Sequence, residues 1–244
     1  MKYLNALVIT CLTLTTPVFA QNLKVAAASN LKLVIKDLAD DFKQKTGITI
    51  ETTIGPSGSL AAQIKGGGPF EVFLSADMDY PESLFKAGLS SKEPASYAEG
   101  KLIVCSKQDV GIQNWLTVLK TDKVKKIGVP NPATSPYGKA AEEALNKKAI
   151  YADVKPKIVY AEGSSEVNAS VFSGANDVGF TSQSVIKDTT AQLFFKVIDP
   201  DAYTKLSQGI VVLKKGESNP SAQKFYDYIL SADAKSIFQM YGYQ

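Results

Sequence analysis

The sequence predicts an α/β fold of two lobes with about a hundred residues each, and three observations support this. Short apolar runs alternate with stretches whose apolar residues recur every three or four positions, which is typical of strands followed by helices. The links between them are short, which favours right-handed crossovers and mixed, mainly parallel sheets. The same alternation begins again after residue 100, without a glycine- and serine-rich linker.

The first half of the chain contains three strand–helix units. Strands are expected at 23–28, 48–54 and 70–76, where the runs are apolar or alternate in polarity. Each strand precedes an amphipathic helix: one with apolar positions over 31–42, one that ends at the glycines 66–68, and one capped by Asp79 that ends near Gly88.

The second half repeats this order. Further strands are expected at 101–106, 194–198 and 206–215, and three strand–turn segments lie between the first two of them. Two amphipathic helices, with apolar positions over 222–230 and 234–241, close the chain. Strand-like stretches near 100 and 200 are the expected hinges. We therefore assign 21–100 plus 201–244 to the first lobe and 101–200 to the second, with a ligand cleft between them.

Residues 1–20 are expected to be a secretory signal peptide. Lys2 precedes the apolar run "ALVITCLTLTTPVFA", and Val18 to Ala20 form a small-residue cleavage site. Ile9 and Thr10 precede Cys11, where a lipoprotein signal has small residues, so no lipid anchor is expected. The sequence holds no other apolar stretch of membrane-spanning length. A soluble, exported protein is the expectation.

The composition excludes several classes of function. One of the 27 basic residues is Lys2, so the exported chain has 26 basic and 24 acidic residues. This near balance of charge does not favour binding to nucleic acids or membrane surfaces. The sequence has no histidine and no arginine, which excludes histidine-based catalysis, histidine metal sites and guanidinium clamps. Cys105 is the only cysteine after residue 20, so no internal disulfide is expected, and its apolar neighbours predict a core residue.

Five turns that follow predicted strands are rich in serine, threonine and glycine and carry almost no charge. They are "AAASN", "GPSGS", "TSPYG", "EGSSE" and "FTSQS", and the first four open helices. A helix start offers free N–H groups, so such turns together suit a small dehydrated anion, although each serine alone could merely cap its helix. A cation would need carboxylates; Asp77 and Asp79 are available, but helix capping also explains them.

The turn "GPSGS" resembles the setting of a nucleophilic serine. It departs from G-x-S-x-G, because Gly58 directly follows Ser57. No histidine is available as a base, and a lysine base such as Lys65 or Lys139 would have to be desolvated, which their polar surroundings do not favour. Ser57 is therefore predicted to hold a ligand, and no enzymatic activity is expected.

Four segments, "VAAASNL", "GPSGSLAAQIKGGGPFEVFLSAD", "SPYGKAAEEAL" and "FYDYILSADAKSIFQMYGY", together resemble the periplasmic molybdate-binding proteins of ABC transporters. The similarity runs in order from about residue 23 to 243. It implies a type II two-lobed solute-binding protein with a two-stranded hinge, which captures molybdate or tungstate and delivers it to an inner-membrane permease. It also implies a periplasmic monomer without a cofactor.

The resemblance also implies the ligand contacts. Ser29 and Ser57 would donate their hydroxyls and N–H groups to the oxygens of molybdate, without ligating the metal, and Asn30 would assist. Tyr137 and Ser164, the latter where the family often has valine, would donate main-chain N–H groups. Ser182 lies where some members have a tyrosine hydroxyl, so a water or another group would supply the fifth contact.

Several alternatives stay open at this stage. Tyr137 could simply pack, and Ser164 could merely cap its helix. The ligand could be another tetrahedral oxyanion, namely sulfate, phosphate or chromate, and the sequence does not rank molybdate against tungstate. A serine hydrolase that uses Ser57 is the remaining alternative.

Overall fold

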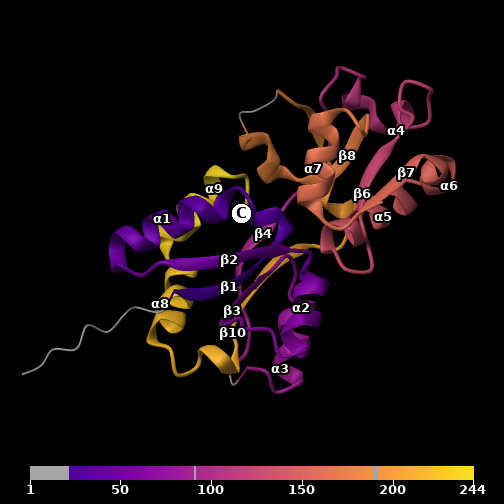
Figure 1. Cartoon of the computed structure of the whole chain (residues 1–244). Helices are drawn as coiled ribbons and strands as arrows, with labels where there is room; N and C mark the ends of the chain where they lie inside the picture. Colours follow the sequence, from indigo (N-terminus) through magenta and orange to yellow (C-terminus); the bar gives the residue numbers. More distant parts are fainter. Residues whose placement is uncertain (1–21, 91, 189–191) are drawn as a thin grey trace, which may run out of the picture.

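The computed structural model describes residues 22–90, 92–188 and 192–244, and the predicted signal peptide lies outside these residues. The described residues form two five-stranded sheets, each flanked by helices in a lobe of its own (Figure 1). Within the described ranges, no helix is both long and apolar enough to cross a membrane.

The sheet of the first lobe joins strands from both ends of the chain. Its strands, in spatial order, are β2 (Ile50–Gly55), β1 (Leu23–Ala28), β3 (Val72–Ser75), β10 (Leu206–Val212) and β4 (Ala95–Gly100). β1 pairs in parallel with β2 and β3, whereas β10 runs antiparallel to β3 and β4. One face is covered by α1 (Val34–Thr46), α8 (Pro220–Ile229) and α9 (Ala232–Met240), and the other by α2 (Ser57–Lys65) and α3 (Asp79–Lys86) (Figure 1).

The side chains of β1 show why the sequence forms three layers here. Val25 packs toward α1 and α8, where Phe42 and Phe225 are fully buried, while its neighbour Ala26 packs against Leu60 of α2. Successive residues of a strand point to opposite faces, so the part of a strand that is covered on both faces, here residues 25–28, is apolar at every position.

The sheet of the second lobe has the same mixed construction. Its strands, in spatial order, are β7 (Ile158–Ala161), β6 (Ile127–Pro130), β8 (Val178–Ser182), β5 (Leu102–Ser106) and β9 (Phe194–Val197). The helices on one face are α4 (Trp115–Val118), α5 (Pro136–Lys147) and α6 (Tyr151–Val154), and α7 (Ser164–Ser173) covers the other.

Short 3-10 helices link the elements of both lobes: η1 (Ser29–Leu31), η2 (Ile112–Asn114), η3 (Lys155–Lys157), η4 (Gln183–Lys187), η5 (Pro200–Ala202) and η6 (Lys214–Gly216). Cys105 is confirmed as a core residue, and burial raises its pKa to about 12.

The chain leaves the first lobe through β4 and returns to it through β10. These two strands pair antiparallel, and Gly100 at the end of β4 lies opposite Leu206 at the start of β10. The expectation of a strand near 100 is met, but the one near 200 is wrong: residues 200–202 form η5, where Pro200 opens the turn and Asp199 accepts a hydrogen bond from the Asp201 N–H at 3.0 Å.

The structure also corrects two helix starts. Asp79 does not cap α3 as predicted but is its first residue, and Asp77 Oδ1 instead accepts the Tyr80 N–H at 3.3 Å. The helix expected from residue 31 begins at Val34, because Ser29–Leu31 form a 3-10 turn first.

Candidate ligand-binding site

The two serines of the first lobe lie beyond the ends of neighbouring strands. Ala28 of β1 is level with Gly55 of β2 in the parallel register, so the chain enters both turns at the same edge of the sheet. Ser29 is then the first residue of η1, and Ser57 is the first residue of α2. Both are buried, with exposed fractions of 6% and 1%. The strand order thus brings together two turns that lie 28 residues apart in the chain.

The second lobe repeats this arrangement with β6 and β7. Pro130 is level with Ala161, and the turns that follow lead into α5 and α7. Tyr137 is the second residue of α5, and Ser164 is the first of α7, and both are fully buried. Helix starts carry N–H groups without an intrahelical partner and a partial positive charge, so each of these turns is a donor site.

The turns of the two lobes contact one another directly. The Gly58 N–H, at the start of α2, donates to the Thr134 carbonyl at 2.8 Å. At the other pair of turns, Ser29 lies against Gly163, the residue before α7: a Cβ on Gly163 would stand 2.5 Å from Ser29 Oγ. The predicted convergence of helix starts from both lobes is therefore present in the structure.

Helix capping does not explain the first four serine-rich turns. The N-cap positions of η1, α2, α5 and α7 are Ala28, Pro56, Ser135 and Gly163, and in this described part of the chain none of them makes a side-chain cap hydrogen bond. The fifth turn differs, because Ser182 Oγ caps η4 by accepting the Ser184 N–H at 3.2 Å. The capping alternative is therefore wrong for Ser164 and holds for Ser182.

The serine hydroxyls differ in what they contact. Ser29 Oγ is buried and has no hydrogen-bond partner among the described residues. Ser57 Oγ accepts the Ala76 N–H at 3.0 Å, which leaves its own proton free to be donated. Ser182 Oγ also lies 3.1 Å from Ser184 Oγ, so its hydroxyl belongs to a local pair.

Tyr137 packs through its ring, as one alternative expected. The ring lies in an apolar cluster of the second lobe that also contains Ala28 and Ala76 of the first lobe. Burial, followed by the neighbouring Tyr243, raises the pKa of the Tyr137 hydroxyl well above its ordinary value. A packed, neutral ring is compatible with a main-chain N–H directed from the first turn of α5.

Two residues that the sequence analysis did not single out complete the floor of this site. Asn30 Nδ2 donates to Gln208 Oε1 at 2.8 Å and to the Tyr243 hydroxyl at 2.9 Å. Gln208 could have been noticed because, with Ser207, it is polar in the otherwise apolar strand "LSQGIVV". Nothing in the sequence distinguishes Tyr243 from its neighbour Tyr241.

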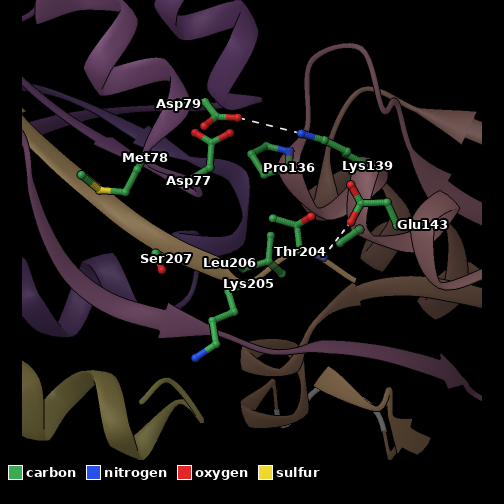
Figure 2. Close-up of a pocket in the computed structure, with 11 residues that line it drawn as sticks. Asp77, Met78, Asp79, Pro136, Lys139, Glu143, Thr204, Lys205, Leu206 and Ser207 are labelled. Carbon is green, nitrogen blue, oxygen red and sulfur yellow. Dashed lines mark hydrogen bonds and ion pairs between the residues drawn. The ribbon is translucent and has the colours of Figure 1, made fainter. Parts of the chain in front are cut away.

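Two cavities lie between the lobes. The smaller, of about 110 Å³, is lined by Ser29 and Asn30 of the first lobe and by Ser165 and Asn168 of α7, together with the charged residues Lys32 and Asp188. The larger, of about 210 Å³, has carboxylates on its walls, with Asp77 and Asp79 facing Lys139 and Glu143 across it (Figure 2). Burial raises the pKa of Asp77 to about 6, which leaves it ionised at neutral pH. The smaller cavity has one acidic residue, Asp188, against three in the larger, so it suits an anion better. Of the predicted contact residues, Ser29 and Asn30 line it.

Two α/β lobes, linked by a paired-strand hinge and facing each other through buried, uncharged donors, define a ligand-binding protein of the two-lobed class. Residues 23–244 match the family described as bacterial extracellular solute-binding protein, and the chain belongs to that family.

Relatives of known name support this assignment. The chain is 36% identical to the molybdate-binding protein ModA of Azotobacter vinelandii, over 92% of this chain and 90% of that protein. It is 32% identical to ModA of Rhodobacter capsulatus, over 94% and 91%. The solved periplasmic molybdate-binding protein of Azotobacter vinelandii superposes with a TM-score of 0.86 and 28% identity, covering 91% of this chain and 99% of that one. The resemblance inferred from the four segments and the two-lobed fold is confirmed.

Proposed function

We propose that this protein captures molybdate or tungstate in the periplasm and delivers the anion to an ABC import permease. The observation that carries the proposal is Ser29 Oγ, a buried hydroxyl without a partner among the described residues, placed against Gly163 at the start of α7. A buried hydroxyl normally has a hydrogen-bond partner, and an oxyanion held between the lobes would supply one. The names of the relatives identify the ligand class.

The remaining donors come from both lobes. Ser57 would donate the hydroxyl proton that its bond with Ala76 leaves free, together with its N–H in the first turn of α2. From the second lobe, Tyr137 and Ser164 would donate N–H groups in the first turns of α5 and α7. Asn30 would act by holding the turn next to Ser29, because its amide hydrogens are donated to Gln208 and Tyr243. Ser182, which pairs with Ser184, would act through a water or not at all.

A site of this kind needs no cationic side chain. A hydrogen bond to a charged partner contributes roughly 1.5–3 kcal/mol, so several of them would reach micromolar affinity or better after the entropic penalty of association. Helix starts add partial positive charge at the same points. The oxygens of molybdate would be the contacted atoms, and the metal would have no ligand from the protein.

Binding and closure are coupled in this proposal. An anion that contacts Ser29 and Ser57 on one lobe and Tyr137 and Ser164 on the other binds the closed arrangement better than an open one, and it therefore shifts the population toward closure. The closed surface is then what the permease recognises. The protein acts as a monomer and catalyses no reaction.

Little in the structure favours the hydrolase alternative. Ser57 is buried and its oxygen accepts a main-chain N–H, whereas Lys139, one of the two candidate bases, is largely exposed and lies 3.9 Å from Asp79. A lysine acts as a base of this kind only where it is desolvated, and an exposed, ion-paired side chain is not.

Thermal unfolding with molybdate, tungstate, sulfate, phosphate and chromate tests the proposal. A ligand at about 100 times its dissociation constant stabilises the protein by roughly 2.7 kcal/mol. We expect this for molybdate and tungstate only, and we expect Ser29→Ala to weaken it. Ser173→Ala, which removes an exposed hydroxyl at the far end of α7, is the matched control. An equal response to sulfate would overturn the choice of ligand, and no response to any anion would overturn the anion site.

A further inference from the structure

Asn30, next to the unpartnered Ser29 hydroxyl, is tied into a buried network of neutral side chains. We propose that Gln208 and Tyr243 are positioning residues for oxyanion binding, which fix Asn30 and through it the turn that presents Ser29. The inference rests on the proposed function, because it assigns the residues that hold that site in place. Neither residue would contact the anion.

The orientation of the Gln208 amide is fixed by the main chain. Its Nε2 donates to two carbonyl oxygens, those of Ala76 at 3.3 Å and Leu206 at 3.2 Å. The reversed amide would place Oε1 against both carbonyls, where no hydrogen is available to form a bond. Gln208 Oε1 must therefore face Asn30, and it accepts from Asn30 Nδ2 at 2.8 Å. Gln208 is fully buried on β10, so this arrangement is shielded from water.

Tyr243 fixes the other side of Asn30. Gly242, with φ of +84°, turns the chain inward at the end of α9, and the Tyr243 ring packs edge-on against Phe238. The neighbouring Gln244 exchanges two main-chain hydrogen bonds with Glu99 of β4, at 2.7 and 2.9 Å, beside the C-terminus marked in Figure 1. The end of the chain is thereby held against the hinge strand, with the Tyr243 hydroxyl buried between the lobes.

The Tyr243 hydroxyl makes two bonds to the same residue. It accepts from Asn30 Nδ2 at 2.9 Å and donates to the Asn30 main-chain carbonyl at 2.9 Å. Ser184 Oγ, from the second lobe, donates to that same carbonyl at 2.9 Å. Both hydrogens of the Asn30 amide are thus bonded within the protein, and both the side chain and the carbonyl are fixed.

This arrangement gives Asn30 a different role from the one that the resemblance implied. An amide whose two hydrogens are already donated to Gln208 and Tyr243 has none left for an anion. Asn30 is therefore a positioning residue, which holds the hydroxyl and N–H of the adjacent Ser29 in the geometry needed to donate hydrogen bonds. The network itself carries no formal charge, so it adds no carboxylate to the one of Glu166 that lies beside Gly163.

Removal of the Tyr243 hydroxyl tests the inference. Tyr241→Phe is the matched control, because the Tyr241 hydroxyl makes a 2.8 Å bond to Asp37 on α1 and does not contact Asn30. By calorimetry we expect Tyr243→Phe to weaken molybdate binding about tenfold, and Tyr241→Phe to leave the dissociation constant within about twofold of the wild type. Equal effects of the two variants would overturn the inference.

A double-mutant cycle with Asn30→Ala shows whether Tyr243 acts through Asn30. We expect Tyr243→Phe to have little further effect on the dissociation constant once Asn30 is alanine, whereas additive effects would overturn the inference. Should Asn30→Ala fail to fold, hydrogen exchange of the main-chain N–H groups of residues 29–31 replaces the cycle. Exchange should be faster in Tyr243→Phe than in Tyr241→Phe, and equal exchange rates in the two variants would overturn the inference. Wild-type protein that binds no molybdate would instead refute the proposed function.

Discussion

The contact between Ser29 and Gly163 allows binding and stability to be separated with one methyl group. Gly163 belongs to the second lobe and Ser29 to the first, and a Cβ added to Gly163 would lie 2.5 Å from Ser29 Oγ and 3.0 Å from Ser29 Cβ. Both distances are shorter than normal van der Waals contact. Gly163→Ala would therefore obstruct the closed arrangement. Within the second lobe the added Cβ would also lie 3.1 Å from Glu166 Oε2, the end of a flexible side chain that can move aside.

The affinity should change more than the ligand-free stability. Gly163 has φ of −153°, which alanine adopts without strain, and the loss of glycine freedom in the unfolded chain would stabilise the protein by about 0.4–1 kcal/mol. Gly163 is also the N-cap of α7, where alanine is less favourable than glycine, so the two effects oppose each other and the net change should stay within about 1 kcal/mol. In the closed state, overpacking of this kind costs about 1–3 kcal/mol. Since 1.4 kcal/mol corresponds to a factor of ten, molybdate should bind roughly 5- to 150-fold more weakly.

Urea unfolding of the ligand-free protein and calorimetric titration with molybdate measure the two effects. Gly55→Ala is the control: it lies at the end of β2 close to Ser57, and its Cβ would meet only the Leu60 side chain at an ordinary 3.5 Å. We expect the control to leave the affinity unchanged. Unchanged affinity in Gly163→Ala would mean that Ser29 and Gly163 do not approach each other when the ligand is bound, which would refute the proposed closure.

Three further changes probe the same region. Ser57→Ala leaves the buried Ala76 N–H unpaired, so urea unfolding should show a loss of about 1–3 kcal/mol, together with weaker molybdate binding; an unchanged urea midpoint would contradict that bond. Burial raises the pKa of Asp77 from 3.8 to about 6, so the folded protein binds this proton more tightly than the unfolded chain. Stability should therefore fall as the pH rises from 3.8 to 6, by about 3 kcal/mol at most, and Asp77→Asn should remove that slope in urea titrations at different pH values. Tyr80→Phe removes a 3.3 Å bond to the Ala133 carbonyl across the lobes, so calorimetry should show about two- to threefold weaker binding with unchanged ligand-free stability.

Much of the fold could be predicted because its signals are local. The buried strands are short apolar runs, and Gly47 and Gly174 end helices with φ of +74° and +76°, a conformation that favours glycine. The errors arose where the local signal was ambiguous. Asp77 and Asp79 are both suitable caps, and only the path of the chain decides that Asp77 receives the N–H of Tyr80. Similarly, Ile198 still donates its N–H to the Leu102 carbonyl at 3.0 Å, and the chain then turns at Pro200 into η5.

The candidate site was predictable only in part, for a physical reason. Ser29 and Ser57 follow strands, and parallel strands bring their ends to one edge, so their meeting follows from the order of elements. Gln208 and Tyr243 reach Asn30 across 178 and 213 residues of sequence, and no short-range pattern records such contacts. The sequence could therefore indicate which groups would donate hydrogen bonds to an anion. It could not indicate which residues position those groups.

The contacts between the lobes also bear on how tightly an anion can be held. Gly58 to Thr134, Ser184 to Asn30 and the Lys139–Asp79 ion pair join the lobes through protein atoms alone. These contacts favour closure by themselves. A ligand therefore has to supply only the remaining free-energy difference between the open and closed states. Because these bonds are few, and the ion pair is long and exposed, their sum stays small. Release of the anion would then require only that a few interlobe bonds be exchanged.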